Sequence, residues 1–202
     1  MANKEYRFEV YVSNSTADSL QNITGKYGSF SGETFAAEAC HAGMLCVRAK
    51  ELPLEGYEEH LTNGNSWYMT KATTGSVSGL TGDRTGIYAC NNYDVAKAAY
   101  GDNHVNFGGQ ILGIGLAADE RGDFTELKLN EKYHFGKDNF STLPSESATY
   151  ATIENGLWAA TASAPTDGSV YAKVISTKKR FIEGAYDGGQ KIELLILRSA
   201  KA

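Results

Sequence analysis

The sequence predicts an all-β protein, a small β-barrel or sandwich with an extended N-terminal arm and a C-terminal β-hairpin region. Composition is the first observation that favours this class. The 202 residues include 22 glycines and 12 tyrosines but only 3 prolines, as expected for many short strands separated by tight turns. Periodicity is the second, because short alternating apolar segments recur between Gly, Asn and Asp residues, whereas helical patterns are sparse.

Alternation and flanking turn residues locate the expected strands. The first covers residues 6–12, where Tyr6, Phe8 and Val10 share one face. Further strands are expected at residues 44–50, 67–72, 86–90, 110–116, 124–129, 133–135, 170–176 and 191–198. The last of these is apolar at most positions, so we expect it to be buried on both faces.

Turns and weak helical signals complete the outline of the fold. Turns are expected at Asn63-Gly64, Asn155-Gly156, Asp167-Gly168 and Asp187-Gly188-Gly189, whose residues tolerate positive φ. Residues 94–99 and the Ala-rich residues 33–40 carry short helical signals, and the polar residues 13–22 indicate a loop or arm.

The domain organisation is expected to have three parts. These are an N-terminal strand and arm at 1–26, a β-barrel-like domain at 27–141 and a C-terminal β-region at 142–202. The second boundary follows from the polar stretch around Pro144. Alternatively, the terminal strands complete a single sheet system and the chain is one domain.

Charge and hydropathy argue against two classes of partner. The formal net charge is -5, the isoelectric point is near 5.4, and the basic residues are scattered, so we expect no binding to nucleic acid. The longest aliphatic run, residues 194–197, is too short to cross a bilayer, and the N-terminus lacks the profile of a secretory leader. We therefore expect no membrane association.

Cysteine and histidine do not form a recognisable reactive or metal-binding pattern. Cys40, His41 and Cys46 would need further ligands to hold zinc, and burial preferences favour two small core residues beside an exposed imidazole. Cys90 lies in an apolar strand and is interpreted as a core thiol. We expect all three cysteines to be reduced. The glycine spacing of residues 113–118 matches a dinucleotide-binding fingerprint, but no helix is expected after it. We therefore interpret these glycines as allowing backbone or side chains of neighbouring strands to approach closely in a sheet.

Two charged motifs are interpreted as surface structure. Arg121-Gly122-Asp123 spells an adhesion tripeptide but is expected to form a turn between Leu116 and Phe124. The carboxylates Glu51, Glu55, Glu58 and Glu59 are expected in a solvated loop, because Pro53 and Gly56 interrupt them. We therefore expect no catalytic residue, no metal site and no cofactor, and hence no enzyme.

Aromatic residues leave one alternative open. The candidates for a sugar-binding face are Trp67, Tyr68, Tyr93, Tyr100, Tyr150, Trp158 and Tyr171. Adjacent strand residues point to opposite sides, so at most one of Trp67 and Tyr68 is expected to be exposed. Core packing is the first interpretation of this set, and burial at a protein interface is the second.

Residues 35–48 and 112–129 together resemble head decoration (cement) proteins of tailed bacteriophages. In that family a strand with an Ala-Gly step precedes a Gly-Ile hairpin in a small β-barrel, and the resemblance covers residues 35–140. It implies an auxiliary capsid protein on the outer surface of the virion, made in the host cytoplasm. It also implies binding to the major capsid protein and assembly as a homo-oligomer, such as a trimer. The segments after Ser141 and before Gly25 have no equivalent in the family pattern.

An extended N-terminal segment would suit such a role, because it can add a strand to a neighbouring sheet. Tyr6, Phe8 and Val10 are the expected capsid contacts. The competing hypothesis is a carbohydrate- or receptor-binding β-module, such as a head fibre or adsorption accessory.

Overall fold

The computed structural model describes residues 8–10, 22–53, 66–75, 80, 82–91, 115–179 and 190–200. The predicted all-β class is confirmed, because strands form two sheets in this part of the chain and a short 3-10 segment at Lys137–Asn139 accompanies them. Within the same ranges, no helix has the length and apolar character needed to cross a membrane.

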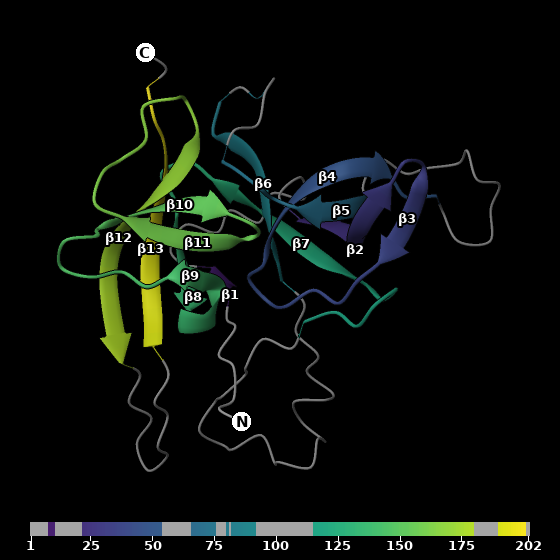
Figure 1. Cartoon of the computed structure of the whole chain (residues 1–202), viewed down its shortest axis with the longest axis horizontal. Helices are drawn as coiled ribbons and strands as arrows, with labels where there is room; N and C mark the ends of the chain where they lie inside the picture. The colour runs from purple at the N-terminus through teal and green to yellow at the C-terminus, as the bar shows by residue number, and fades with distance from the viewer. Residues whose placement is uncertain are drawn as a thin grey trace, which may run out of the picture.

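The first sheet forms a closed five-stranded barrel with one additional strand. Its strands are β2 (Asn22–Ser31), β3 (Thr34–Ala37), β4 (Leu45–Glu51), β5 (Ser66–Lys71), β6 (Arg84–Cys90) and β7 (Arg121–Lys128). They follow the order β3-β2-β5-β4-β6-β7, and a further pairing of β2 with β7 closes the barrel. Strand β3 therefore remains outside the closed barrel, hydrogen-bonded to β2 at the end of the molecule away from the second sheet (Figure 1).

The second sheet has seven strands and curls into a half-barrel. Its strands are β1 (Phe8–Val10), β8 (Lys132–Gly136), β9 (Phe140–Thr142), β10 (Tyr150–Glu154), β11 (Leu157–Thr161), β12 (Val170–Lys179) and β13 (Gln190–Arg198). Their order is β1-β8-β13-β12-β10-β11-β9. The N-terminal strand β1 thus lies at the edge of a sheet whose other strands all come from residues 132–198.

Strand β6 separates two cores, because its side chains alternate between them. Ile87 and Ala89 pack in the larger core with the seven-stranded sheet, whereas Tyr88 and Cys90 pack inside the barrel. All four side chains are fully buried. A strand buried on both faces ties the two sheets into one packed unit.

Most of the predicted strands are present. The structure has strands overlapping the predictions at 44–50, 67–72, 86–90, 124–129, 133–135, 170–176 and 191–198. Asn155-Gly156 joins β10 to β11 as expected, with φ of 50° and 79°. We predicted that β13 is buried on both faces, and this is only half right. Ile192, Leu194 and Ile196 on one face are fully buried, whereas the side chains at 193, 195 and 197 on the other face are half-buried.

Two predictions for local structure are wrong. Arg121-Gly122-Asp123 does not form a turn but begins β7, because its backbone pairs with residues 24–26 of β2, and the turn lies at residues 118–119. Residues 33–40 are not helical, since pairing of Phe35 with Phe30 makes residues 34–37 a strand. Strand β2 was not predicted at all, because Gly25 and Gly28 interrupt its alternation.

Some predictions fall outside the described residues. These are the turns at 63–64 and 187–189, the short helix at 94–99 and most of the strand at 110–116. Residues 22–26, placed in the predicted arm, belong to β2. The division of the chain into three parts at 26 and 141 stays a prediction.

Phe8 provides a test of how β1 is held. Its side chain is 0% exposed, and its ring lies 5.7 Å from that of Tyr133 and 5.3 Å from that of Phe135. Phe8→Ala should lower the free energy of unfolding by about 3–5 kcal/mol in denaturant titrations, because it leaves a cavity. Leu143→Ala is the control, since Leu143 is 45% exposed and its truncation should cost less than about 0.5 kcal/mol. Equal stability of the two variants would contradict the docking of β1.

Candidate functional site

A surface pocket lies where the β2–β3 hairpin meets β5 and the end of β4. Its volume is about 430 Å³, within the range of small-ligand pockets. The described lining residues are Phe30, Glu33, Phe35, Lys50, Glu51, Pro53 and Tyr68. Three of them are aromatic and three are charged, so the pocket offers both apolar surface and ionic partners.

A two-residue turn brings two of the aromatic side chains together. Ser31 pairs with Thr34 across the turn, and Gly32 within it has φ of 60°, which glycine adopts without strain. Phe30 and Phe35 are consequently direct cross-strand partners, with ring centroids 5.2 Å apart.

Gly28 provides the space that the Phe35 ring occupies. A Cβ atom at position 28 would lie 2.1 Å from the Ala36 carbonyl oxygen and 2.7 Å from Cζ of Phe35. Any larger residue at position 28 would therefore push β3 and the ring away from β2.

Tyr68 supplies the third ring from β5, which runs parallel to β2. Its ring centroid lies 4.4 Å from that of Phe35 and 5.7 Å from that of Phe30, the latter contact being edge-on at 84°. These separations suit favourable aromatic contacts. All three side chains are half-buried, so together they form one continuous apolar surface that solvent reaches.

Charged side chains surround this aromatic surface. Nζ of Lys50 lies 3.7 Å from Oε2 of Glu33, and the two side chains are 63% and 96% exposed. An ion pair this exposed contributes about 0–1 kcal/mol. Glu51 is half-buried at the end of β4. The described lining thus carries two carboxylates and one ammonium group, and the Arg121 guanidinium lies beside it, with Nη2 donating a hydrogen bond to the Pro53 carbonyl oxygen at 3.0 Å.

The outer edge of β3 lies beside the pocket. Among the described residues, β3 pairs only with β2. The Glu38 amide donates a hydrogen bond to the Tyr27 carbonyl at 3.0 Å. Along β3, residues whose main-chain groups bond to β2 therefore alternate with residues whose main-chain groups face the other side, counting from Glu38. From this register, the main-chain amides and carbonyls of Phe35 and Ala37 point away from β2. No main-chain hydrogen bond from another described residue engages them.

The predicted capsid contacts lie elsewhere. Phe8 is buried in its own chain, Val10 pairs with Tyr133 in the β1–β8 ladder, and Tyr6 lies outside the described residues. The structure does not test whether these residues meet a capsid, and that assignment stays a prediction.

The predicted aromatic candidates do not gather on one face, and Tyr93 and Tyr100 lie outside the described residues. Trp158 is fully buried. Tyr68 and its neighbour Trp67 differ as expected for adjacent strand residues, since Tyr68 lines the pocket while Trp67 packs against the barrel core and under Arg48. Tyr150 and Tyr171 contact each other on the seven-stranded sheet, with ring centroids 6.0 Å apart.

Sequence reasoning missed the rest of the pocket. Phe30 and Phe35 were not among the aromatic candidates. Their signal is a Gly-containing turn between two aromatic residues, which is typical of a hairpin. The predicted acidic loop contributes Glu51 to the pocket, whereas Glu55, Glu58 and Glu59 lie outside the described residues.

The cysteines lie in the barrel interior and not at a reactive surface. Cys40, Cys46 and Cys90 are all buried, and no disulfide joins them. Burial raises the pKa of the Cys40 thiol well above its usual value, with a further contribution from the neighbouring Cys46. In the described ranges, no group of three or more His, Cys, Asp or Glu side chains is placed to hold a metal ion.

A thiol titration checks this arrangement. At pH 8 a disulfide reagent should modify none of the three cysteines of the native protein within minutes and all three after unfolding in guanidinium. The reason is that only an exposed thiolate attacks the reagent, and all three thiols are buried. Rapid reaction of any native thiol would contradict the buried assignment.

Comparison of the chain with protein-family models, with curated proteins and with solved structures finds no match in any of the three. The resemblance carried by residues 35–48 and 112–129 therefore stays a prediction. The pocket and the adjoining edge of β3 together form the candidate site.

Proposed function

We propose that the chain is a non-enzymatic virion protein that binds the outer surface of a bacteriophage capsid and stabilises contacts between major capsid subunits. The observation that carries the proposal is the outward-facing edge of β3 beside the aromatic pocket. An extended segment of a capsid subunit would add to this edge as a further strand. Affinity would come from main-chain hydrogen bonds, and specificity from side chains that enter the pocket.

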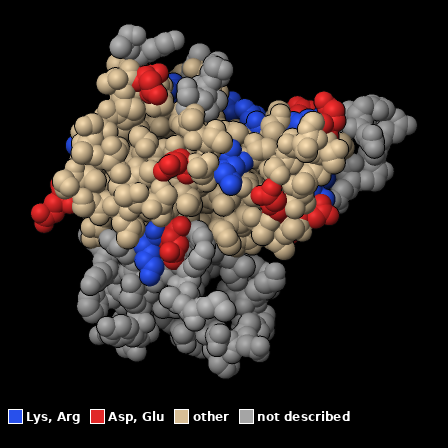
Figure 2. All heavy atoms as spheres, viewed as in Figure 1, with Lys and Arg blue, Asp and Glu red and all other residues tan. Residues whose placement is uncertain are grey.

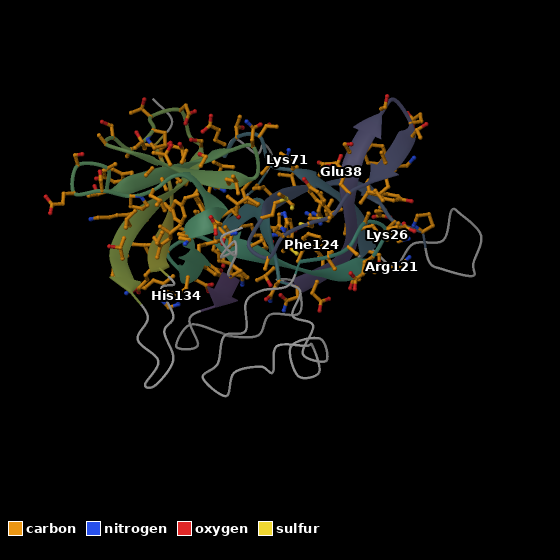
Figure 3. All side chains as sticks on the ribbon, turned by 60° about the horizontal axis from the view of Figure 1, so that its bottom comes forward. Lys26, Glu38, Lys71, Arg121, Phe124 and His134 are labelled. Carbon is orange, nitrogen blue, oxygen red and sulfur yellow. The ribbon has the colours of Figure 1, made fainter. Side chains whose placement is uncertain are left out.

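The geometry of β3 suits strand addition. Phe35 and Ala37 direct their main-chain groups outward, so an added strand gains a short ladder without disturbing the bonds to β2. The β2–β3 hairpin also extends beyond the barrel (Figure 3). Aromatic side chains are enriched at the centres of protein interfaces, because they bury a large area at a small entropic cost.

The pocket is better suited to binding than to catalysis. Its described lining includes no cysteine, serine, threonine or histidine that would act as a nucleophile or a proton shuttle. Glu33 is almost fully exposed, so water solvates its carboxylate and weakens any effect on a reacting group.

The resemblance and the surface charge support the same proposal. The residues that resemble decoration proteins include parts of β3 and β4 and all of β7, which are strands of the first sheet. Acidic and basic side chains are interspersed on the face of the molecule in Figure 2. Weak contacts repeated over a symmetric shell would act together through their high effective concentration.

The burial of Phe8 bears on which part of the chain would contact the capsid. Its side chain has no exposed surface in the described fold, so it offers nothing to a neighbour while β1 remains docked. We therefore assign the principal contact to β3 and retain Tyr6, Phe8 and Val10 as a secondary hypothesis.

Binding to undecorated capsids tests the proposal. Purified protein should bind them saturably at a fixed ratio in co-sedimentation. Ala37→Pro removes an outward amide at a sheet edge, where proline is tolerated, and Phe35→Ala removes pocket surface. Each should weaken binding by about tenfold or more, the effect of ~1.4 kcal/mol.

Leu143→Ala is the matched control, because Leu143 is a large exposed apolar residue on the other sheet. It should bind as the unmodified protein does, and thermal melts should show that all variants are folded. Absence of saturable binding, or binding that neither β3 variant weakens, would refute the proposal. A specific hit on a glycan array that Tyr68→Ala abolishes would instead establish the carbohydrate-binding alternative.

A further inference from the structure

We infer that the Asn155-Gly156 turn is a latch between the two sheets, and that it is also a modification site at which opening of the latch becomes irreversible. The turn joins β10 to β11 of the seven-stranded sheet, and its main chain bonds to strands of the barrel. The modification is the conversion of Asn155 to isoaspartate, which needs no reactant besides water. The inference does not depend on capsid binding.

Gly156 completes the hydrogen-bond ladder between β4 and β5. Cys46 pairs with Lys71, so Leu45 and Ala72 are the next residues along this ladder. The Ala72 amide donates a hydrogen bond to the Leu45 carbonyl at 2.9 Å. The reciprocal bond is replaced by two, because the Leu45 amide donates to the Gly156 carbonyl at 2.8 Å and the Gly156 amide donates to the Ala72 carbonyl at 2.7 Å. One residue of the second sheet thus bridges two strands of the first.

The bridge lies in the interior, where its hydrogen bonds are hard to replace. Leu45 and Ala72 are 0% and 1% exposed and belong to the larger core. A buried amide or carbonyl that loses its partner destabilises the fold. Gly156 itself has φ of 79°, and a Cβ atom there would lie 2.9 Å from Cγ of Lys71. The latch therefore requires glycine at position 156 and a turn of the present length.

The same two residues form a reactive sequence. After losing its proton, the main-chain nitrogen of Gly156 attacks Cγ of Asn155, which forms a carbon–nitrogen bond and releases the side-chain nitrogen as ammonia. Water then opens the resulting succinimide ring at either carbonyl, which gives aspartate or isoaspartate. In isoaspartate the main chain runs through the former side chain and is longer by a methylene group.

The closed latch blocks the first step of this reaction. The hydrogen bond to Ala72 holds the amide proton of Gly156, and the residue is buried, so its nitrogen is kept from attacking the exposed side chain of Asn155. Local opening of the turn frees the amide to react. The longer main chain of isoaspartate no longer fits between Leu45 and Ala72, so a chain that has reacted cannot close the latch again.

Isoaspartate formation in folded and unfolded protein tests the protection. In mildly alkaline buffer at one temperature, peptide mapping should find conversion of Asn155 at least about tenfold slower in the native protein than in guanidinium. Asn63-Gly64 is the other Asn-Gly step of the chain, and its conversion in guanidinium is the internal reference for the reaction. Equal rates at Asn155 in folded and unfolded protein would overturn the inference.

The two products of the reaction test the latch. Both are prepared in an Asn63→Gln background, so that no other Asn-Gly step converts. Asn155→Asp is the matched control, because it has the charge of isoaspartate and a main chain of normal length. Protein aged in guanidinium, refolded and enriched in isoaspartate at position 155 should exchange the Leu45 amide proton at least about tenfold faster than this control.

The outcome at Leu45 decides whether the turn holds the sheets together. Faster exchange in the isoaspartate form supports the latch, and so does failure of that form to refold while Asn155→Asp folds normally. Equal exchange in the two folded proteins would show that the length of the main chain at position 155 does not matter and would overturn the latch.

Discussion

Closure of the barrel by β2 is the constraint on which the candidate site depends. The first half of β2 pairs with β5 on one side and β7 on the other, and the second half pairs with β3. Gly25 allows this, because a Cβ atom there would lie 2.7 Å from both the Trp67 carbonyl oxygen and Cγ of Met69. Since β2 is longer than its partners in the barrel, its remaining residues leave the barrel as the hairpin that builds the pocket.

The rest of the molecule gives that hairpin a rigid support. A buried carboxylate, that of Glu126, stabilises β6 where its pairing with β7 shifts register. It accepts hydrogen bonds from Nη2 of Arg84 at 2.9 Å and from the Gly86 amide at 2.8 Å. Leaving the charge of Glu126 without Arg84 would be costly in the interior. The pair therefore holds β6, whose two faces belong to the two cores, in a single arrangement.

The sequence was informative where side-chain alternation reports burial and uninformative where backbone contacts decide the structure. Apolar alternation located β4 to β8, β12 and β13, because one face of each strand packs in a core. Strand β2 was not predicted because it contains Gly25 and Gly28, which lie against neighbouring strands and interrupt the apolar alternation. The pocket was not predicted for a different reason. Tyr68 reaches Phe30 and Phe35 through the parallel pairing of β5 with β2, and a local sequence pattern does not encode such a long-range pairing.

An exposed sheet edge is also a hazard, since it can pair with another copy of the same chain. Strand β3 limits this in two ways. It has only four residues, and the exposed carboxylates of Glu33 and Glu38 flank it. Two copies meeting at β3 would bring four carboxylates together, and like charges held close across an interface are repelled. The carboxylates that flank β3 thus disfavour pairing of this edge with a second copy of the chain.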